Sequence, residues 1–214
     1  MSTFQEMDEF VTLWDLVQQA QFNTQPDRII WKWTADGCYS TKSAYLAQFQ
    51  GSVSPFDCKS IWQAHAEGKH KFFTWLFIQA RILTADKLAL RNWPCNPTCA
   101  LCDQTAESAA HLCLHCPFAR EVWEKMRRWT NGVVAVPMIE EQSIAEWWSA
   151  SLWGLNKQQK RTKAAFMMYT TWNIWKERNR RVFNAQNCNP LQVFNFIKEE
   201  MDLRRKACGA PWPD

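Results

Sequence analysis

The spacing of apolar residues predicts a chain built mainly from α-helices. Apolar positions recur every three or four residues over most of the sequence, as one buried face of a helix requires. The predicted helices cover residues 7–20, a segment through Ala44 and Phe49, and residues 69–83, 85–91, 118–129, 143–154, 158–183 and 190–206. Residues 29–34 and 38–40 instead have strand character on either side of a turn at 35–37, which predicts one small N-terminal β-hairpin.

Residues 93–117 interrupt the helical pattern. They show no periodicity and contain Pro94, Pro97 and Pro117. The segment nevertheless holds five of the nine cysteines and two of the four histidines. A loop of this length with little apolar material is unusual inside a compact domain, so we expect something other than hydrophobic packing to hold it.

Four residues of this segment have the spacing of a zinc site. Cys99, Cys102, His111 and Cys116 form the pattern Cys-X2-Cys-X8-His-X4-Cys. Zn²⁺ prefers four thiolate or imidazole donors in a tetrahedron, and four protein ligands leave no position for water. The sequence therefore predicts one structural Zn²⁺ and no catalytic one. The expected fold class is mainly α: a helical domain with one small N-terminal β-hairpin and a zinc-bound loop.

Three neighbouring residues are alternative candidates for zinc ligands. Cys113 lies in an alternating His-Leu-Cys-Leu-His-Cys run, which favours a small buried apolar residue. His115 adjoins Cys116, and we expect it to point away from a metal bound by that neighbour. Cys95 precedes Pro97 closely and fits a free thiol. The alternative to a metal site as a whole is a chance grouping among nine cysteines.

Composition places the chain among globular intracellular proteins. Its 214 residues, 47% apolar and 21% charged, are enough for one large domain or two small ones. The longest apolar stretch, Phe72 to Ile78, is too short to cross a membrane. Acidic residues near the N-terminus argue against a secretory signal, and cysteines without such a signal favour metal binding inside the cell. Nucleus and cytoplasm are not distinguished.

Positive charge is concentrated after residue 58. Residues 1–58 carry a balance of −4 and residues 59–214 a balance of +8, which permits contact with nucleic acid without requiring it. The candidate nucleic-acid contacts lie just before the aromatic residues at 72–75 or after the cysteine-rich segment 93–117, which we call the metal loop. They are Lys69, Lys71, Lys125, Arg127 and Arg128. An ordinary solvated helix surface is the alternative for each of them.

The predicted helix over 158–183 has two distinct faces. At 100° per residue, one stripe holds Ala165, Met168, Trp172 and Trp175. The opposite face holds Lys160, Lys163, Arg178 and Arg181, with Met167 and Ile174 between the two basic pairs. We therefore expect the middle turns to be covered on both sides, and either basic end to be solvated or to touch phosphate. The 14 Trp and 13 Phe residues fit a core filled by large side chains.

Several longer runs resemble one known family. They are Lys-His-Lys-Phe-Phe-Thr-Trp-Leu at 69–76, Arg-Asn-Trp at 91–93, Cys-Ala-Leu-Cys at 99–102, Cys-Pro-Phe-Ala at 116–119 and Trp-Asn-Ile-Trp-Lys-Glu-Arg-Asn at 172–179. Together they resemble the reverse-transcriptase zinc-binding domain of plant LINE-type non-LTR retrotransposon polyproteins. The resemblance implies that Cys99, Cys102, His111 and Cys116 are the zinc ligands. Glu67-Gly68 departs from the family, which often has proline shortly before the first run.

The resemblance implies a non-catalytic accessory module of a reverse transcriptase that binds RNA or DNA. None of the three tyrosines begins a polymerase Tyr-X-Asp-Asp motif, which indicates a detached polyprotein tail or a gene fragment. We expect no small-molecule substrate and no membrane contact, and a reverse transcriptase domain is a candidate partner. The alternatives are a zinc-stabilised protein–protein interaction module and a non-functional retroelement fragment. The expected domains are an N-terminal lead-in (1–55), the zinc-binding domain (56–130) and a C-terminal helical segment (131–214).

Overall fold

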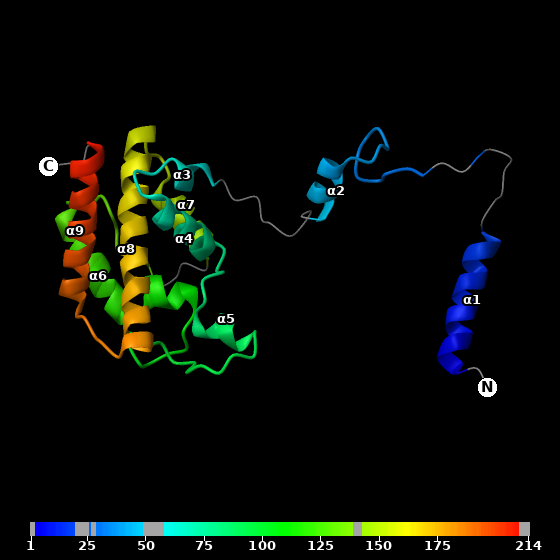
Figure 1. Cartoon of the computed structure of the whole chain (residues 1–214), viewed down its shortest axis with the longest axis horizontal. Helices are drawn as coiled ribbons and strands as arrows, with labels where there is room; N and C mark the ends of the chain where they lie inside the picture. The colour runs from blue at the N-terminus through cyan, green and yellow to red at the C-terminus, as the bar shows by residue number, and fades with distance from the viewer. Residues whose placement is uncertain (1–2, 20–25, 27–28, 49–57, 139–142, 210–214) are drawn as a thin grey trace. The chain divides into compact units, whose positions relative to one another are not determined.

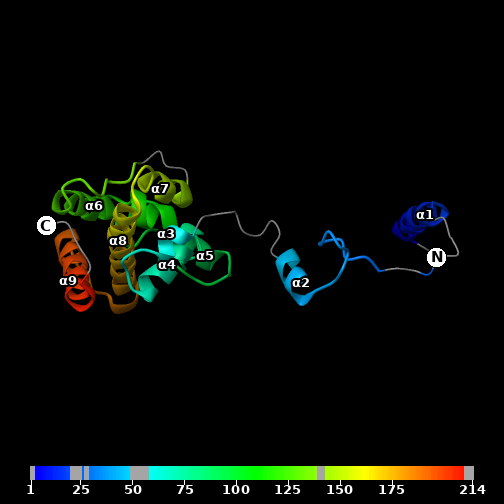
Figure 2. The same cartoon turned by 90° about the horizontal axis from the view of Figure 1, so that it is seen from above.

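The computed structural model describes residues 3–19, 26, 29–48, 58–138 and 143–209. The chain separates into two units, Met1–Ser54 and Pro55–Asp214, which are described individually below. Figures 1 and 2 show helices as the regular elements of both units. Within the described ranges, β pairing is limited to an isolated antiparallel bridge between Thr98 and Ala106. The prediction of a mainly α-helical chain is therefore confirmed.

The first unit contains helices α1 (Phe4–Gln18) and α2 (Thr41–Gln48). Helix α1 begins three residues earlier than predicted because Thr3 and Glu6 form a reciprocal capping box. Ser40 Oγ accepts a hydrogen bond from the Ser43 N–H at 3.1 Å, which stabilises the first turn of α2. The predicted end of that helix at Phe49 lies outside the described residues.

The predicted N-terminal hairpin is not shown. Residues 29–40 form turns with no strand on either side. The Trp31 N–H donates to the Gly37 carbonyl at 2.8 Å, and the Trp31 and Tyr39 rings meet edge to face. Gly37 has φ of +69°, a conformation that favours glycine. A single cross-turn hydrogen bond without a supporting layer is too little to stabilise a ladder of strands.

The second unit is a bundle of helices that also contains the metal loop. Its elements are α3 (Lys59–Trp62), α4 (Gly68–Ile78), α5 (Ala85–Ala89), the π-helix η1 (His111–His115), α6 (Pro117–Trp129), α7 (Ile144–Ser151), α8 (Lys157–Asn184) and α9 (Pro190–Cys208). Helix α4 ends five residues before the predicted Leu83, and Ala80 just beyond it has a left-handed φ of +50°. Asn131 and Gly132, with φ of +48° and +82°, follow α6 where the sequence predicts its end. The described residues include no helix with both the length and the apolar character needed to cross a bilayer.

Helix α8 is the central element of this unit. It lies between α9 and α4 in both views and also contacts α3, α6 and η1. Met167 and Ile174 are buried together with Met168, so the middle turns are covered on both sides, as the sequence predicts. Trp123 and Trp148 are among the largest fully buried side chains, which confirms an aromatic core.

The polar face of α8 differs from the prediction at its C-terminal end. Arg178 was expected to be solvated or to touch phosphate, and this expectation is wrong because the side chain is only 5% exposed and paired with Glu107. Arg181 is also largely covered by protein. At the other end Lys160 is exposed, as a solvated helix end requires, whereas Lys163 is half-buried and burial lowers its pKa. Charged residues at helical spacing are thus divided between solvent and interior by their tertiary neighbours.

A buried polar cluster joins α4, α8 and α9. Glu200 accepts hydrogen bonds from Asn173 Nδ2 at 3.0 Å and Lys176 Nζ at 2.9 Å, and its carboxylate lies 3.4 Å from His70 Nε2. Burial alone would raise the pKa of Glu200, but these three partners outweigh it and lower the pKa to about 2. The cluster therefore stabilises the ionised carboxylate.

We expect Glu200→Gln to destabilise the protein by about 2 kcal/mol at neutral pH, because hydrogen bonds to a charged group are lost. The folded pKa lies below the unfolded value, so this stabilisation is present above about pH 4.5 and is lost as the pH falls towards 2. Urea unfolding of wild type and variant across this range measures the effect. Metal loss in acid affects both proteins alike, so the relevant quantity is the difference between them. A difference that does not shrink in acid would contradict the assignment.

Candidate metal centre

The structure brings Cys99, Cys102, His111 and Cys116 into one group. Their donor atoms all lie within 4.8 Å of one another. The two thiols of Cys99 and Cys116 are 4.0 Å apart, and Cys102 Sγ lies 3.4 Å from His111 Nε2. A tetrahedron with Zn–S near 2.3 Å and Zn–N near 2.0 Å has edges of about 3.8 Å between sulfurs and about 3.5 Å between sulfur and nitrogen. The donor spacing therefore fits a single Zn²⁺.

The first pair of donors lies on a tight turn. The Cys99 N–H donates to the Thr105 carbonyl at 2.8 Å, beside the Thr98–Ala106 bridge, and the Asp103 N–H donates to the Cys99 carbonyl at 2.9 Å. Asp103 has φ of +53°, which turns the chain back after Cys102. Both thiols of the Cys-X2-Cys sequence consequently point to the same side.

The second pair is brought together by the π-helix η1. Its wider turn is closed by a 2.7 Å hydrogen bond from the Cys116 N–H to the His111 carbonyl, five residues earlier. In an α-helix, residues five apart are rotated by about 140° from each other, so their side chains would diverge. The π-turn makes five residues close to one full turn and places His111 and Cys116 on the same side.

Hydrogen bonds between the donor side chains shift their pKa values. The hydrogen bond between the thiols of Cys99 and Cys116 lowers the pKa of Cys99 to about 4 and raises the pKa of Cys116. Hydrogen bonds to Cys99 and Cys102 raise the pKa of His111 against the effect of burial. A zinc ion would replace the protons that these ligands share, because thiolates and neutral imidazole are the binding forms.

Residues outside the group support its geometry. The Thr105 hydroxyl lies 3.2 Å from His111 Nδ1, the ring nitrogen that a metal at Nε2 would leave for an outer partner, and 3.1 Å from Nε2. Arg181 Nη1 donates to the carbonyls of Ala100 and Leu101 at 3.1 and 3.0 Å. The Arg181 guanidinium on α8 thus fixes the backbone of the Cys-X2-Cys turn.

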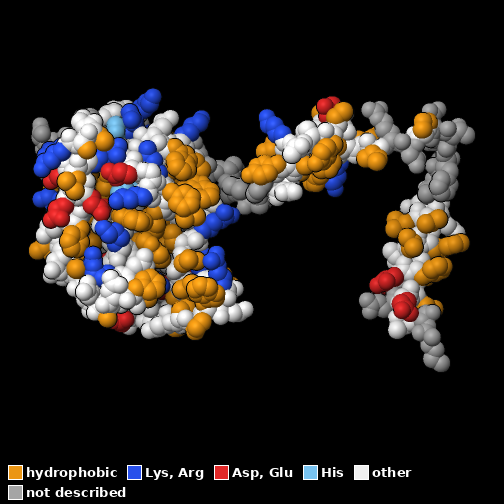
Figure 3. Space-filling model, viewed as in Figure 1, with side chains coloured by type: hydrophobic (Ala, Val, Ile, Leu, Met, Phe, Trp, Pro, Cys, Tyr) orange, Lys and Arg blue, Asp and Glu red, His pale blue; other side chains and the backbone are white. Residues whose placement is uncertain are grey.

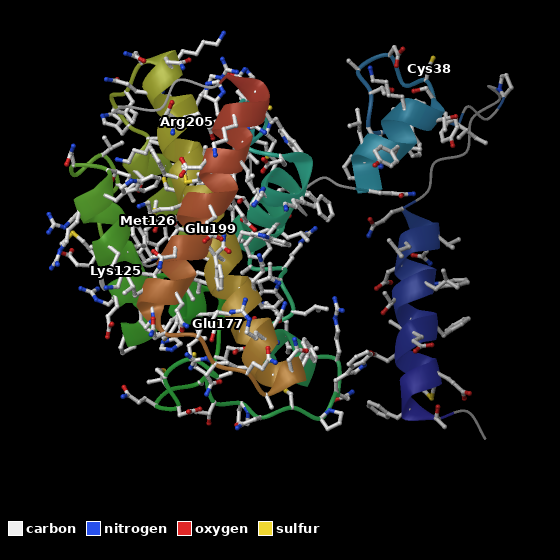
Figure 4. All side chains as sticks on the ribbon, turned by 60° about the vertical axis from the view of Figure 1, so that its left-hand side comes forward. Cys38, Lys125, Met126, Glu177, Glu199 and Arg205 are labelled. Atoms are coloured by element: carbon white, nitrogen blue, oxygen red, sulfur yellow. The ribbon has the colours of Figure 1, made fainter. Side chains whose placement is uncertain are left out.

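Glu177 fixes this arginine in turn. Its carboxylate is fully buried, pairs with Arg180, and accepts from Arg181 Nε at 2.9 Å and from the Cys188 N–H at 2.8 Å. Figure 4 shows Glu177 towards the lower end of α8. The sequence analysis missed this network, although glutamate three and four residues before arginine is a recognisable helical pairing signal.

The three competing residues lie outside the donor group. Cys113 is fully buried in the core, and burial raises the pKa of its thiol. Cys95 Sγ contacts the Ala85 carbonyl at 3.5 Å. His115 ends η1 and is not a member of the group. The expectation for Cys113 as a small buried residue is therefore confirmed by its burial.

The metal loop has more apolar support than the sequence suggests. Leu112, Cys113 and Leu114 are all buried in the core, and Trp123 Nε1 donates to the Cys113 carbonyl at 2.7 Å. The expectation that this segment has little apolar material to hold it is wrong for its second half. The η1 turn contacts both α6 and α8.

A buried ion pair connects the loop to α8. Arg178 Nη2 lies 2.7 Å from Glu107 Oε1, and Nε donates to both carboxylate oxygens at 3.1 Å. The same carboxylate accepts the Ala85 N–H at 2.9 Å, at the start of α5. Glu107 therefore joins three parts of the unit, and its role depends on partners far away in the sequence.

The predicted nucleic-acid contacts fall into two groups. Lys69 is exposed on α4, whereas Lys71 Nζ donates to the Trp62 carbonyl at 2.9 Å. On α6, Lys125 is half-buried (Figure 4), and Arg127 and Arg128 both bind Glu124. Hydrogen bonds from Arg127 and Arg128 lower the pKa of Glu124 to about 2. Two of the three predicted contacts on α6, Arg127 and Arg128, are thus already paired with a carboxylate.

The helical fold and the four donors at tetrahedral spacing together define the class of protein: a helical domain with a site that fits zinc. Residues 39–123, which include all four donors, match the family described as zinc-binding in reverse transcriptase. The chain therefore carries a reverse-transcriptase zinc-binding domain, and the resemblance seen in the sequence is confirmed.

A plant protein shows similarity over a wider range. The chain is 24% identical over 184 residues to "Putative ribonuclease H protein At1g65750" of Arabidopsis thaliana. The alignment covers 81% of this chain but only 28% of that relative. No solved structure matches the chain.

Proposed function

We propose that this chain is a non-catalytic, zinc-stabilised accessory module that binds RNA or DNA beside a reverse transcriptase inside the cell. The observation that carries the proposal is the convergence of Cys99, Cys102, His111 and Cys116 at tetrahedral spacing in a reverse-transcriptase zinc-binding domain. We assign these four residues as the ligands of one structural Zn²⁺. Four protein ligands leave no site for an activated water, which supports a structural role.

Nucleic-acid binding is supported by the charge distribution and the domain family. The excess of +8 over residues 59–214 favours association with phosphates, and Lys69 and Lys125 have no carboxylate partner within the described ranges. We propose that residues 56–130 supply the zinc-binding part and that 131–214 form its helical support, with 1–55 as the lead-in. The ribonuclease name of the plant relative belongs to a much longer protein.

The test combines metal analysis with binding at several salt concentrations. We expect about one zinc per chain, and an affinity for single- and double-stranded probes that falls steeply as salt rises. A zinc-loaded chain that binds neither probe at low salt would overturn the nucleic-acid part. A metal-free chain with an ordered loop would overturn the zinc part.

Charge variants on α6 give a sharper prediction. Glu124→Gln should raise affinity for nucleic acid because it releases Arg127 and Arg128 from their shared carboxylate. Lys125→Gln should lower affinity and reduce the salt slope by about 0.7 to 0.9. Fluorescence anisotropy with labelled oligonucleotides measures both effects. Equal affinities for wild type and Glu124→Gln would argue against α6 as a contact surface.

An apolar groove favours the second candidate function, a protein–protein interaction module. The groove, of about 820 Å³, lies against the metal loop and the C-terminal end of α8. Leu83, Trp93, Val182 and Phe183 line it and are exposed. Exposed apolar patches of this kind are typical of interaction surfaces. Zinc binding without any nucleic-acid affinity would favour this function.

A further inference from the structure

A basic pocket lies where α3, α4, α8 and α9 meet. It has a volume of about 350 Å³. Its lining includes Trp62, His65 and the cations Lys71, Lys157, Arg161 and Arg204. Four of these carry a positive charge and none carries a carboxylate. Figure 3 shows Lys, Arg and His side chains along the upper edge of this unit, where α8 begins and α9 ends.

The cations of the pocket are only partly satisfied by the protein. Lys71 Nζ donates to the Trp62 carbonyl and Arg161 Nε to the Gln63 carbonyl at 2.8 Å, so each uses a single donor. Both groups retain further N–H donors. Arg204 Nε and His65 Nε2 are buried with no hydrogen-bond partner in the described part of the chain. A ligand with several acceptor oxygens would satisfy donors of this kind.

The nearest carboxylate does not neutralise the pocket. Glu67 Oε1 lies 3.4 Å from Arg204 Nη1, but the same carboxylate also accepts the Tyr169 hydroxyl at 2.6 Å and lies 2.7 Å from His70 Nδ1. Burial and then Arg161, Arg204 and Lys71 lower the pKa of His65. Burial together with Arg204 and Arg161 lowers the pKa of Lys71. At both groups the neighbouring cations therefore add to the effect of burial.

An aromatic side chain stands at the edge of the pocket. Trp62 is 50% exposed, although it follows directly after the fully buried Ile61. Tryptophan beside a cluster of cations is the combination that binds single strands, because the ring stacks an unpaired base while the cations hold its phosphate. Bases inside a duplex are already stacked and are not available to such a ring.

We propose that this pocket binds a backbone phosphate of single-stranded nucleic acid, with the adjoining base stacked on Trp62. The inference rests on the proposed nucleic-acid function and assigns it a site. Lys157 and Arg161 come from the first turns of α8, whereas Arg181 contacts the metal loop about 30 Å further along the same helix. Changes in the pocket should therefore leave the zinc site intact.

The test compares two matched double variants of the full chain. Lys157→Gln with Trp62→Leu removes one charge and one ring from the pocket, and neither side chain has a hydrogen bond or ion pair to another described residue. Arg91→Gln with Trp93→Leu removes one charge and one exposed ring beside the metal loop instead. Zinc content and far-UV circular dichroism establish that both variants are folded.

The probes are fluorescein-labelled oligothymidylate and oligouridylate of about 12 nucleotides and a duplex of equal length, measured by anisotropy between about 50 and 200 mM salt. For the pocket variant we expect affinity for the single strands to fall about tenfold or more and the salt slope to decrease by about 0.7. The matched control should bind single strands as wild type does.

Each other result has a definite meaning. Wild-type affinity and slope in the pocket variant would overturn the pocket assignment while the proposed function stands. An equal loss for duplex and single strands would overturn the stacking role of Trp62. If the folded, zinc-loaded wild type binds no probe, both the pocket assignment and the nucleic-acid function fail.

Discussion

Cys102→Ser is expected to release zinc from the protein and to loosen residues 93–130. Cys102 is half-buried and supplies one of the two thiols of the tight turn, 3.4 Å from His111 Nε2. Serine is a poor ligand for zinc, so three donors would remain. Structural zinc contributes on the order of several kcal/mol to folding, and its loss should destabilise the loop that it joins. Metal content per chain and hydrogen exchange over residues 93–130 measure the two effects.

Cys95→Ser is the matched control for this experiment. Cys95 lies in the same segment and is also half-buried, but its Sγ lies 3.5 Å from the Ala85 carbonyl and is not a member of the donor group. This variant should retain about one zinc and normal protection. Retention of a full equivalent of zinc by Cys102→Ser would contradict the ligand assignment. We expect the buried half of the loop, Leu112 to Leu114, to retain more protection than the Cys-X2-Cys turn.

Arg178→Met is expected to destabilise the protein by about 3–5 kcal/mol. The substitution leaves the Glu107 carboxylate, which is 1% exposed, without its guanidinium partner. Among the residues that the structure describes, the Ala85 N–H would be the remaining donor to that carboxylate. Chemical denaturation at neutral pH, with intrinsic tryptophan fluorescence as the probe, measures the loss.

Two further variants separate charge burial from simple loss of contact. Adding Glu107→Leu to Arg178→Met should recover part of the lost stability, because no unpaired charge then remains buried. Arg127→Met breaks the exposed pair with Glu124 and should change the midpoint very little, because water screens exposed ion pairs. A double variant as unstable as the sum of both single variants would show that the ion pair is not the source of the effect.

The helices of the second unit were predictable because their signals are local. The apolar periodicity placed α6, α8 and α9 to within a few residues, and Asn131-Gly132 correctly indicated the end of α6. The hairpin at 29–40 failed for the opposite reason. A strand pattern is realised only when a neighbouring strand or layer completes it, and the described residues provide none.

The role of individual charges could not be predicted from helical spacing. Arg178 and Lys160 share the same polar face of α8, yet one is buried against Glu107 and the other is exposed. The difference arises from the loop that covers the C-terminal end of the helix. Similarly, Lys71 was selected as a phosphate contact, but Arg161 and Arg204, its neighbours in the pocket, are 90 and more residues away.

By itself, the sequence determined the helical content and the Cys-X2-Cys-X8-His-X4-Cys set, because both depend on residues within a few turns of each other. Tertiary structure decided the rest. Packing of Leu112 and Leu114 against α6 and α8 accompanies the π-turn that aligns His111 with Cys116. Tertiary structure also decided the pairing of Glu107 with Arg178, which are 71 residues apart in the sequence. Such partners are chosen by which surfaces exclude water together, and only the folded chain specifies those surfaces.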